Sequence, residues 1–189
     1  MTAPVVLSFS GSATVEGRRL SGVAHAFGEV AQLAGGTYEV IAAGAFDKAL
    51  RHSDVRAFVE HDRRLILGRQ SAGTLKLKAS AEGLHYDIPE LPNTSYANDL
   101  LESVRRGDVT ENSFSFMPGA FDLSRAKDGK PIRTHTSVAE LIDISPVTMP
   151  AFAGTSVQLR SIQPEPESIP SQLARARARA LNRSNHVHR

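Results

Sequence analysis

The sequence contains no cysteine in its 189 residues. This absence excludes disulfides, thiolate zinc sites and a cysteine nucleophile, and it suits a reducing compartment. No apolar run approaches the ~18 residues of a membrane-spanning helix. The first residues, MTAPVVLSFSGS, also lack the basic start and long apolar run of a secretory signal. We therefore expect a soluble intracellular protein with no membrane partner.

The motifs of several enzyme classes are missing as well. There is no phosphate-cradling glycine loop, no GxSxG nucleophile elbow and no HExxH metal motif. Four histidines show no close pair spacing that would favour a metal site: His25, His52, His85 and His135. We expect neither a metal nor a cofactor.

The chain nevertheless has the composition of a folded domain. Hydrophobic residues make up 41% and charged residues 22% of the sequence, close to globular averages. A chain of this length can bury a sizeable core and carry a short appendage. We therefore expect one domain.

Charge and composition change near residue 160. Residues 161–189 hold five arginines against two glutamates, whereas residues 1–160 hold 17 basic and 18 acidic groups. The stretch SIQPEPESIPSQ is too polar and proline-rich to fold, and an Arg-Ala repeat follows it. We expect a folded domain over 1–160 and a disordered, basic tail over 161–189, which either is simply solvated or tethers the chain to an acidic partner. Nucleic-acid binding is not expected, because the domain itself is not basic.

Periodicity predicts strands with few helices. The best helix is PNTSYANDLLESVRRGD, which Gly107 ends. GTLKLKAS and GLHYDIPE predict a hairpin around a turn in which Gly83 adopts a positive φ. Further strands are expected over 5–10, 20–27, 37–41 and 55–59, the first two as a hairpin, with a short helix over 44–53 and a β-rich run from 132. The fold class expected is mainly β with peripheral helices (α+β), forming a closed or partly closed antiparallel β-barrel.

Two serines alternate with two phenylalanines in VTENSFSFMP, residues 109–118. Strand periodicity puts Ser113 and Ser115 on one face, and Phe114 and Phe116 on the other. The phenylalanines are expected to enter the core. For the serines, parity alone favours an ordinary solvent-facing face over a catalytic hydroxyl.

His61 ends the strand-like stretch DVRAFVEHD. Continued parity places it on the apolar face, where a histidine is usually a half-buried structural residue. A strand end is also where a barrel presents groups to a cleft, and imidazole suits proton transfer near neutral pH. Both interpretations remain open at this level.

The stretch AELIDIS offers two carboxylates that could orient an imidazole. Glu140 and Asp143 lie three positions apart and so point to opposite faces of a strand. Glu140 shares parity with isoleucines, whereas Asp143 shares it with Leu141 and Ser145, the more polar side. A Ser–His–acid hydrolase is compatible with these residues, and either acid can equally be a surface charge.

The order of the motifs resembles a known family. Its elements are GAF near a helix start, EHD followed by LG, GL in a hairpin, SFSF on a strand after a helix, and the closing ELIDISPVTMPAF. This succession, over roughly residues 20–160, resembles the prohead (capsid-maturation) serine proteases of tailed bacteriophages and phage-derived gene transfer particles. These are distant counterparts of the herpesvirus assemblin proteases.

The resemblance implies a barrel-shaped serine endopeptidase with the catalytic residues His61, Ser113 and Asp143. Glu60 stands where the family commonly has asparagine, Ser115 where it usually has glycine, and Asp143 where glutamate is more usual. Glu140 remains a fallback for the acid.

The resemblance also implies the biological role. Such an enzyme cleaves the major capsid protein and a scaffolding segment inside the immature shell, in the cytoplasm of the bacterial host, and often cleaves its own tail; a homo-oligomer is possible. The alternatives are a catalytically inactive capsid-assembly or scaffolding protein of the same fold, and a small nucleic-acid-binding barrel that uses the arginine tail.

Overall fold

The computed structural model describes residues 4–9, 12–32 and 36–149. The expected tail over 161–189 lies outside these residues, as does the boundary near 160. Within the described part of the chain, no helix is both long and apolar enough to cross a bilayer.

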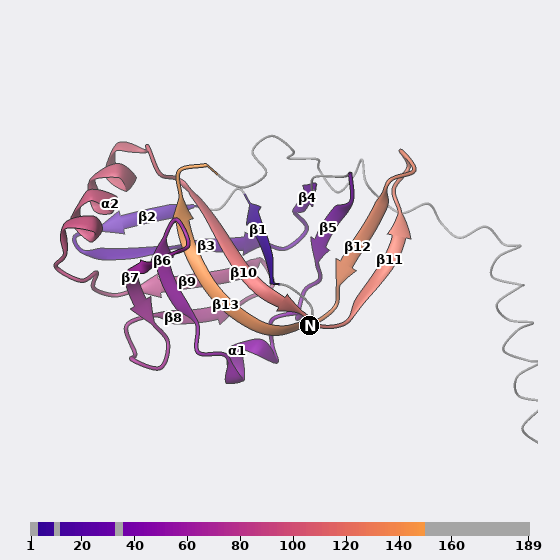
Figure 1. Ribbon diagram of the computed structural model, residues 1–189, viewed down its shortest axis with the longest axis horizontal. Coiled ribbons are helices and arrows are strands. Elements are labelled where there is room, and N and C mark those ends of the chain that lie inside the picture. The colour runs from indigo at the N-terminus through magenta and orange to yellow at the C-terminus, as the bar shows by residue number, and fades with distance from the viewer. Residues whose placement is uncertain (1–3, 10–11, 33–35, 150–189) are drawn as a thin grey trace, which may run out of the picture.

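The strands of these described residues form three sheets (Figure 1). In spatial order, the five-stranded sheet comprises β1 (Val5–Phe9), β10 (Glu111–Pro118), β13 (Val138–Val147), β6 (Arg56–Val59) and β7 (Asp62–Arg69). The second comprises β11 (Phe121–Arg125), β12 (Pro131–His135), β5 (Tyr38–Ile41) and β4 (Val30–Gln32). The third comprises β2 (Ala13–Glu16), β3 (Arg19–Ala26), β9 (Gly83–Ile88) and β8 (Lys76–Ala79). The long strands β10 and β13 run side by side through the middle of the molecule.

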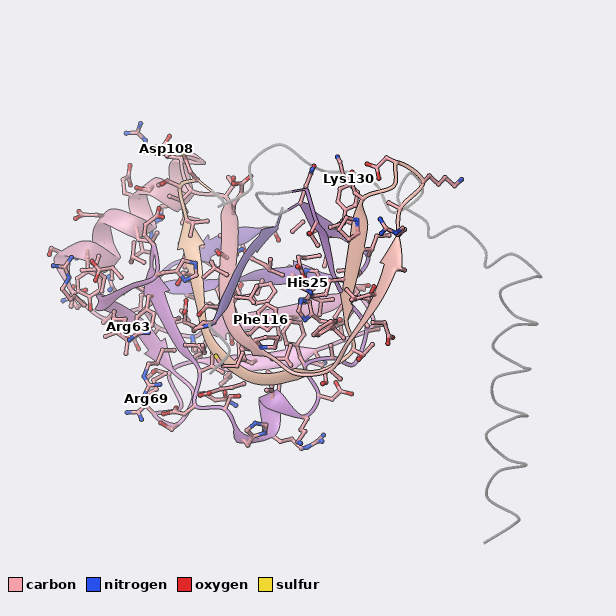
Figure 2. The ribbon with its side chains drawn as sticks, turned by 45° about the vertical axis from the view of Figure 1, so that its right-hand side comes forward. His25, Arg63, Arg69, Asp108, Phe116 and Lys130 are labelled. Atoms are coloured by element: carbon pink, nitrogen blue, oxygen red, sulfur yellow. The ribbon has the colours of Figure 1, made fainter. Side chains whose placement is uncertain are left out.

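The core lies against one face of β10. Phe114 and Phe116 are fully buried, as expected, and their ring centroids are 5.7 Å apart. Phe46 meets Phe114 edge to face at 5.6 Å, an arrangement that aromatic rings favour. Figure 2 shows His25 and Phe116 in the interior of the fold, whereas labelled charged residues such as Arg63 lie at its periphery. The two phenylalanines thus anchor the strand that carries the two serines.

The helix predicted from PNTSYANDLLESVRRGD is present as α2 (Ser95–Arg106). Leu100, Leu101 and Val104 form its buried stripe, and Gly107 ends it with a φ of 81°. That left-handed conformation is what glycine supplies at a helix C-terminus. Thr94 occupies the N-cap position, but its side chain makes no capping hydrogen bond.

Several expectations about topology were wrong or remain unconfirmed. The described residues contain no sheet closed into a barrel, so the barrel is not confirmed. The pairing is not wholly antiparallel, because β13 pairs with β6, and β12 with β5, in parallel. β1 does not form a hairpin with the strand over 20–27. It pairs with β10 instead, and β2 takes the hairpin position. The helix expected over 44–53 is reduced to α1 (Ala49–His52).

The β8–β9 hairpin is present, but Gly83 is needed for a different reason than expected. It is not among the glycines with positive φ. A Cβ at this position would lie 2.1 Å from the backbone oxygen of His25 on β3. Gly83 therefore permits close approach of two backbones rather than a special turn conformation.

Glu29, in the turn between β3 and β4, is a half-buried acid. Its Oε2 atom is buried and accepts no hydrogen bond within the described residues. Burial raises the pKa of Glu29 to about 7. Between the unfolded-state pKa of ~4.3 and about 7, the folded state therefore holds a proton that the unfolded state has lost, so stability falls as pH rises through this window.

We expect Glu29→Gln to be more stable than the wild type at pH 8 by about 1 kcal/mol, a figure reduced for the partial exposure of the side chain. At pH 4 the difference should vanish, because the wild-type carboxyl is then protonated in both states. Urea unfolding at the two pH values measures this, with the exposed Glu102→Gln on α2 as control. A stability gain that is equal at pH 4 and pH 8 would contradict the assignment.

Candidate functional site

His61 and Asp143 form a hydrogen-bonded pair between β6–β7 and β13. The Nδ1 atom of His61 lies 2.6 Å from Oδ1 of Asp143. With Nδ1 donating its proton to the carboxylate, Nε2 is the ring's acceptor. Nε2 is buried and makes no hydrogen bond within the described residues. The pair thus presents an oriented imidazole whose second nitrogen is available to take a proton.

His61 is held in a tight turn rather than at the end of a strand, so the parity argument did not apply to it. Val59 pairs with Asp62, which leaves Glu60 and His61 as a two-residue hairpin loop. Their φ angles are 52° and 57°. Positive φ at both central residues is typical of a type I′ turn, which normally takes Asn-Gly. Two non-glycine residues in this conformation store roughly 1 kcal/mol or more each, and such strain concentrates at functional sites.

Glu60 fastens this turn to the end of β13. Its backbone N–H donates to the carbonyl of Pro146 at 3.1 Å, and its carboxylate accepts the backbone N–H of Thr148 at 2.5 Å. Because Asp143 lies on the same strand, the two contacts fix the histidine-bearing turn relative to the acid. Glu60 therefore has a structural role that its charge alone did not indicate.

Asp143 is 6% exposed and fully hydrogen-bonded. Oδ1 accepts from His61 and, at 2.8 Å, from the hydroxyl of Ser145, while Oδ2 accepts from the hydroxyl of Ser115. Burial alone would raise the pKa of this carboxyl. The hydrogen bonds from His61, Ser115 and Ser145, together with the nearby imidazole, outweigh burial and hold the pKa of Asp143 below its ordinary value. The acid is therefore kept ionised.

The two serines of β10 lie opposite residues of β13 and are buried. Ser113 lies opposite Ser145, and Ser115 lies opposite Asp143, in the antiparallel register. Ser113 is 1% exposed, and its hydroxyl donates to the carbonyl of Leu7 on β1 at 3.1 Å. The expectation that the serines lie on a solvent-exposed face of the strand is therefore wrong. β10 is an inner strand of its sheet, with the core on one face and a polar cluster on the other.

Glu140 and Asp143 do not occupy comparable places. Asp143 is buried beside His61, whereas Glu140 is exposed. A register shift between Ser115 and Phe116 leaves Ile142 unmatched, so Leu141 joins Ile144 in the core instead of sharing a face with Asp143. The bulge reverses the side-chain alternation, which parity arguments cannot anticipate. The structure thus brings Asp143, not Glu140, to the imidazole.

A family model described as caudovirus prohead serine protease matches residues 8–168. The chain belongs to this family. No match was found among curated proteins or among solved structures. The family is one of serine peptidases that act in capsid maturation in tailed phages, as the resemblance implied.

Two departures of this prohead protease family member from the expected pattern are in direct contact. Ser115 stands where glycine was expected, and Asp143 stands where glutamate was expected. They are cross-strand neighbours joined by a hydrogen bond. Sequence reasoning treated them as separate irregularities, because periodicity does not show which strand lies beside β10.

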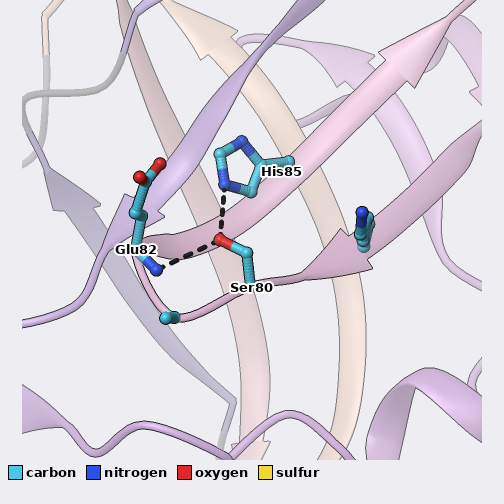
Figure 3. A pocket seen from close by; sticks show the side chains of 5 residues that line it. Ser80, Glu82 and His85 are labelled. Carbon is cyan, nitrogen blue, oxygen red and sulfur yellow. Dashed lines mark hydrogen bonds between the residues drawn. The ribbon is translucent and has the colours of Figure 1, made fainter.

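A second serine–histidine pair, which sequence reasoning missed, lies in the β8–β9 hairpin (Figure 3). Ser80 Oγ is 2.9 Å from Nε2 of His85, beside an open hollow of about 410 Å³. The same hydroxyl accepts the backbone N–H groups of Glu82 and Gly83 at 3.1 and 3.4 Å. No carboxylate bonds to His85 within the described residues. This pair is better explained as a turn-stabilising contact than as a catalytic one.

His135 and His25 have structural surroundings. His135 is buried against Glu39, with Nε2 2.6 Å from Oε2, and Arg133 binds the other carboxylate oxygen at 2.9 Å. His25 is buried among aromatic rings, and burial lowers its pKa to about 3 despite a backbone hydrogen bond to Ile41. Across residues 4–9, 12–32 and 36–149, no group of three or more potential ligands could hold a metal ion.

Proposed function

We propose that the chain is a serine endopeptidase in which Ser113 is the nucleophile, His61 the general base and Asp143 the orienting acid. The observation that carries this proposal is the His61–Asp143 pair, whose imidazole keeps an acceptor nitrogen in a buried site. It occurs in a chain that belongs to a serine peptidase family. The strand beside Asp143 carries both candidate nucleophiles.

The chemistry follows from these roles. Nε2 of His61 takes the proton from Ser113 as Oγ attacks a peptide carbonyl, and Asp143 stabilises the imidazolium that forms. The imidazolium then protonates the leaving amine, which leaves an acyl-enzyme. Water, deprotonated by the same nitrogen, hydrolyses the ester and restores the serine. No metal or cofactor enters the reaction.

Ser113 is preferred over Ser115 because the Ser115 hydroxyl is already engaged. Its proton is donated to Asp143, the acid that must stay ionised. A nucleophile has to donate to the imidazole instead. Ser113, two residues earlier on the same face of β10, donates its hydroxyl to the neutral main-chain carbonyl of Leu7, a weaker acceptor than a carboxylate, so its proton is the easier of the two to redirect to the imidazole.

The substrates follow from the family. We propose that the enzyme cleaves the major capsid protein, a scaffolding segment or both during prohead maturation. Cleavage would take place inside the immature capsid in the cytoplasm of the bacterial host. Self-cleavage in the segment after residue 160 and assembly into a homo-oligomer are parts of this proposal.

A specific observation favours a second candidate, a catalytically inactive capsid-assembly or scaffolding protein of the same fold. Ser113 is almost inaccessible, and β1 lies directly beside it. An inactive relative needs no access to this hydroxyl, whereas an enzyme must admit a peptide to it.

A serine-directed covalent probe tests the proposed function. We expect diisopropyl fluorophosphate to add one phosphoryl group to the full chain, mapped to Ser113 by peptide mass spectrometry, and to block cleavage of the capsid protein. An adduct on Ser115 would overturn the choice of nucleophile. A chain that is neither labelled nor able to shorten the capsid protein would favour the inactive candidate. The mass of the recovered chain reports self-cleavage in the same experiment.

A further inference from the structure

The carboxylate of Asp143 is surrounded by more donors than the imidazole alone supplies. Ser145 donates to Oδ1 at 2.8 Å, and Ser115 donates to Oδ2. Ser145 is fully buried and Ser115 nearly so. A buried carboxylate with unfilled lone pairs is costly, so the two hydroxyls have an energetic reason to be there.

Sheet geometry aims both hydroxyls at the acid. Ser115 lies directly opposite Asp143 on β10, where cross-strand side chains of one face are closest. Ser145 lies two residues beyond Asp143 on β13, on the same face. One donor thus comes from the neighbouring strand and one from the acid's own strand. Together they hold both carboxylate oxygens and so fix the rotation of the carboxylate plane.

We propose that Ser115 and Ser145 are positioning residues that clamp the Asp143 carboxylate so that Oδ1 faces Nδ1 of His61. The inference rests on the proposed function, in which that contact sets the tautomer and orientation of the base. With both hydroxyl protons given to the carboxylate, neither serine competes for Nε2. Asp143 has a short side chain, and the clamp holds it to a single geometry.

The clamp makes a prediction about catalysis. We expect Ser115→Ala and Ser145→Ala each to lower kcat/KM about tenfold, which corresponds to ~1.4 kcal/mol, and the double variant to lower it further. Ser115→Thr and Ser145→Thr keep a hydroxyl and should recover most of the activity. If the alanine variants had the kcat/KM of the wild type, the inference would be overturned.

A second readout does not depend on activity. Carbon-13 NMR titration of the Asp143 carboxyl in the full chain should show its pKa rising in both alanine variants, because donors to the ionised form are lost. The nitrogen-15 signals of the His61 ring should show Nδ1 protonated in the wild type and a mixture of tautomers in the double variant. Unchanged NMR parameters in a folded double variant would overturn the clamp and leave the proposed function standing.

The two proposals fail in different ways. If the wild type cleaves no capsid protein but the Asp143 pKa still rises in the alanine variants, the clamp is supported and the proposed function is lost. Thermal unfolding by circular dichroism identifies any variant that has merely unfolded. If an alanine variant has unfolded, kcat/KM and the NMR parameters of the threonine variants, which preserve the buried polar contacts, test the clamp instead.

Discussion

Replacing Ser113 with alanine is expected to reduce kcat/KM for cleavage of a capsid-protein peptide by about 10⁴-fold or more. The change removes the attacking oxygen and leaves His61 with nothing to deprotonate. The fold should persist, because the substitution deletes only the Oγ atom, which donates to the Leu7 carbonyl. His61→Ala should cause a loss of similar size, since the members of a triad act as a unit. Co-expression with the capsid protein, followed by mass spectrometry, measures both.

Two matched serine variants control this experiment. Ser115→Ala should keep easily measurable activity, about tenfold below the wild type, which separates a positioning hydroxyl from a nucleophile. Ser124→Ala, on β11 in a different sheet, should leave processing unchanged. Normal capsid-protein shortening by the Ser113→Ala chain would refute the proposed mechanism.

Gly83→Ala is expected to destabilise the fold by roughly 3 kcal/mol or more, the upper end of overpacking effects. The added methyl group would lie 2.1 Å from the His25 carbonyl oxygen and 3.0 Å from the Cα of Ala26. Both are main-chain atoms in the paired strand β3, so neither can move without breaking the β3–β9 ladder. The free energy of unfolding from urea titration measures the loss.

Gly73→Ala is the matched control for this prediction. Gly73 has a φ of 72°, and an added Cβ would meet nothing within 4 Å. Its cost is therefore conformational strain alone, about 1 kcal/mol. Equal losses in the two variants would show that close approach at Gly83 is not the reason for its glycine.

Local features of this fold were predictable, and pairings between distant segments were not. The stripe of α2 and the alternation in β8 and β9 are patterns complete within a dozen residues. By contrast, β1 could pair with any exposed edge, and nothing in its five residues indicates β10. The parallel neighbours β6 and β13 were equally hidden, because periodicity describes faces and not partners.

The candidate site shows the same division. The order of motifs identified Ser113, His61 and Asp143. Parity, by contrast, predicted that His61 ends a strand, which it does not, and placed Leu141 on the wrong face of its strand. A two-residue turn with positive φ takes His61 out of the strand, and a bulge shifts the alternation in β13 by one position. The clamping role of Ser145 depends on side-chain rotation around Asp143, which only the folded structure reveals.

The parallel contact between β6 and β13 also bears on when activity can first arise. His61 and Asp143 are 82 positions apart in the chain, and contacts of such separation form late in folding because a long loop must close first. A nascent chain that has emerged only as far as β10 already carries Ser113 and His61 but has no acid to orient the imidazole. Under the proposed mechanism, a nascent chain that ends before β13 is therefore inactive. In this mechanism, proteolysis can begin only after β13 has been synthesised and has paired with β10 and β6.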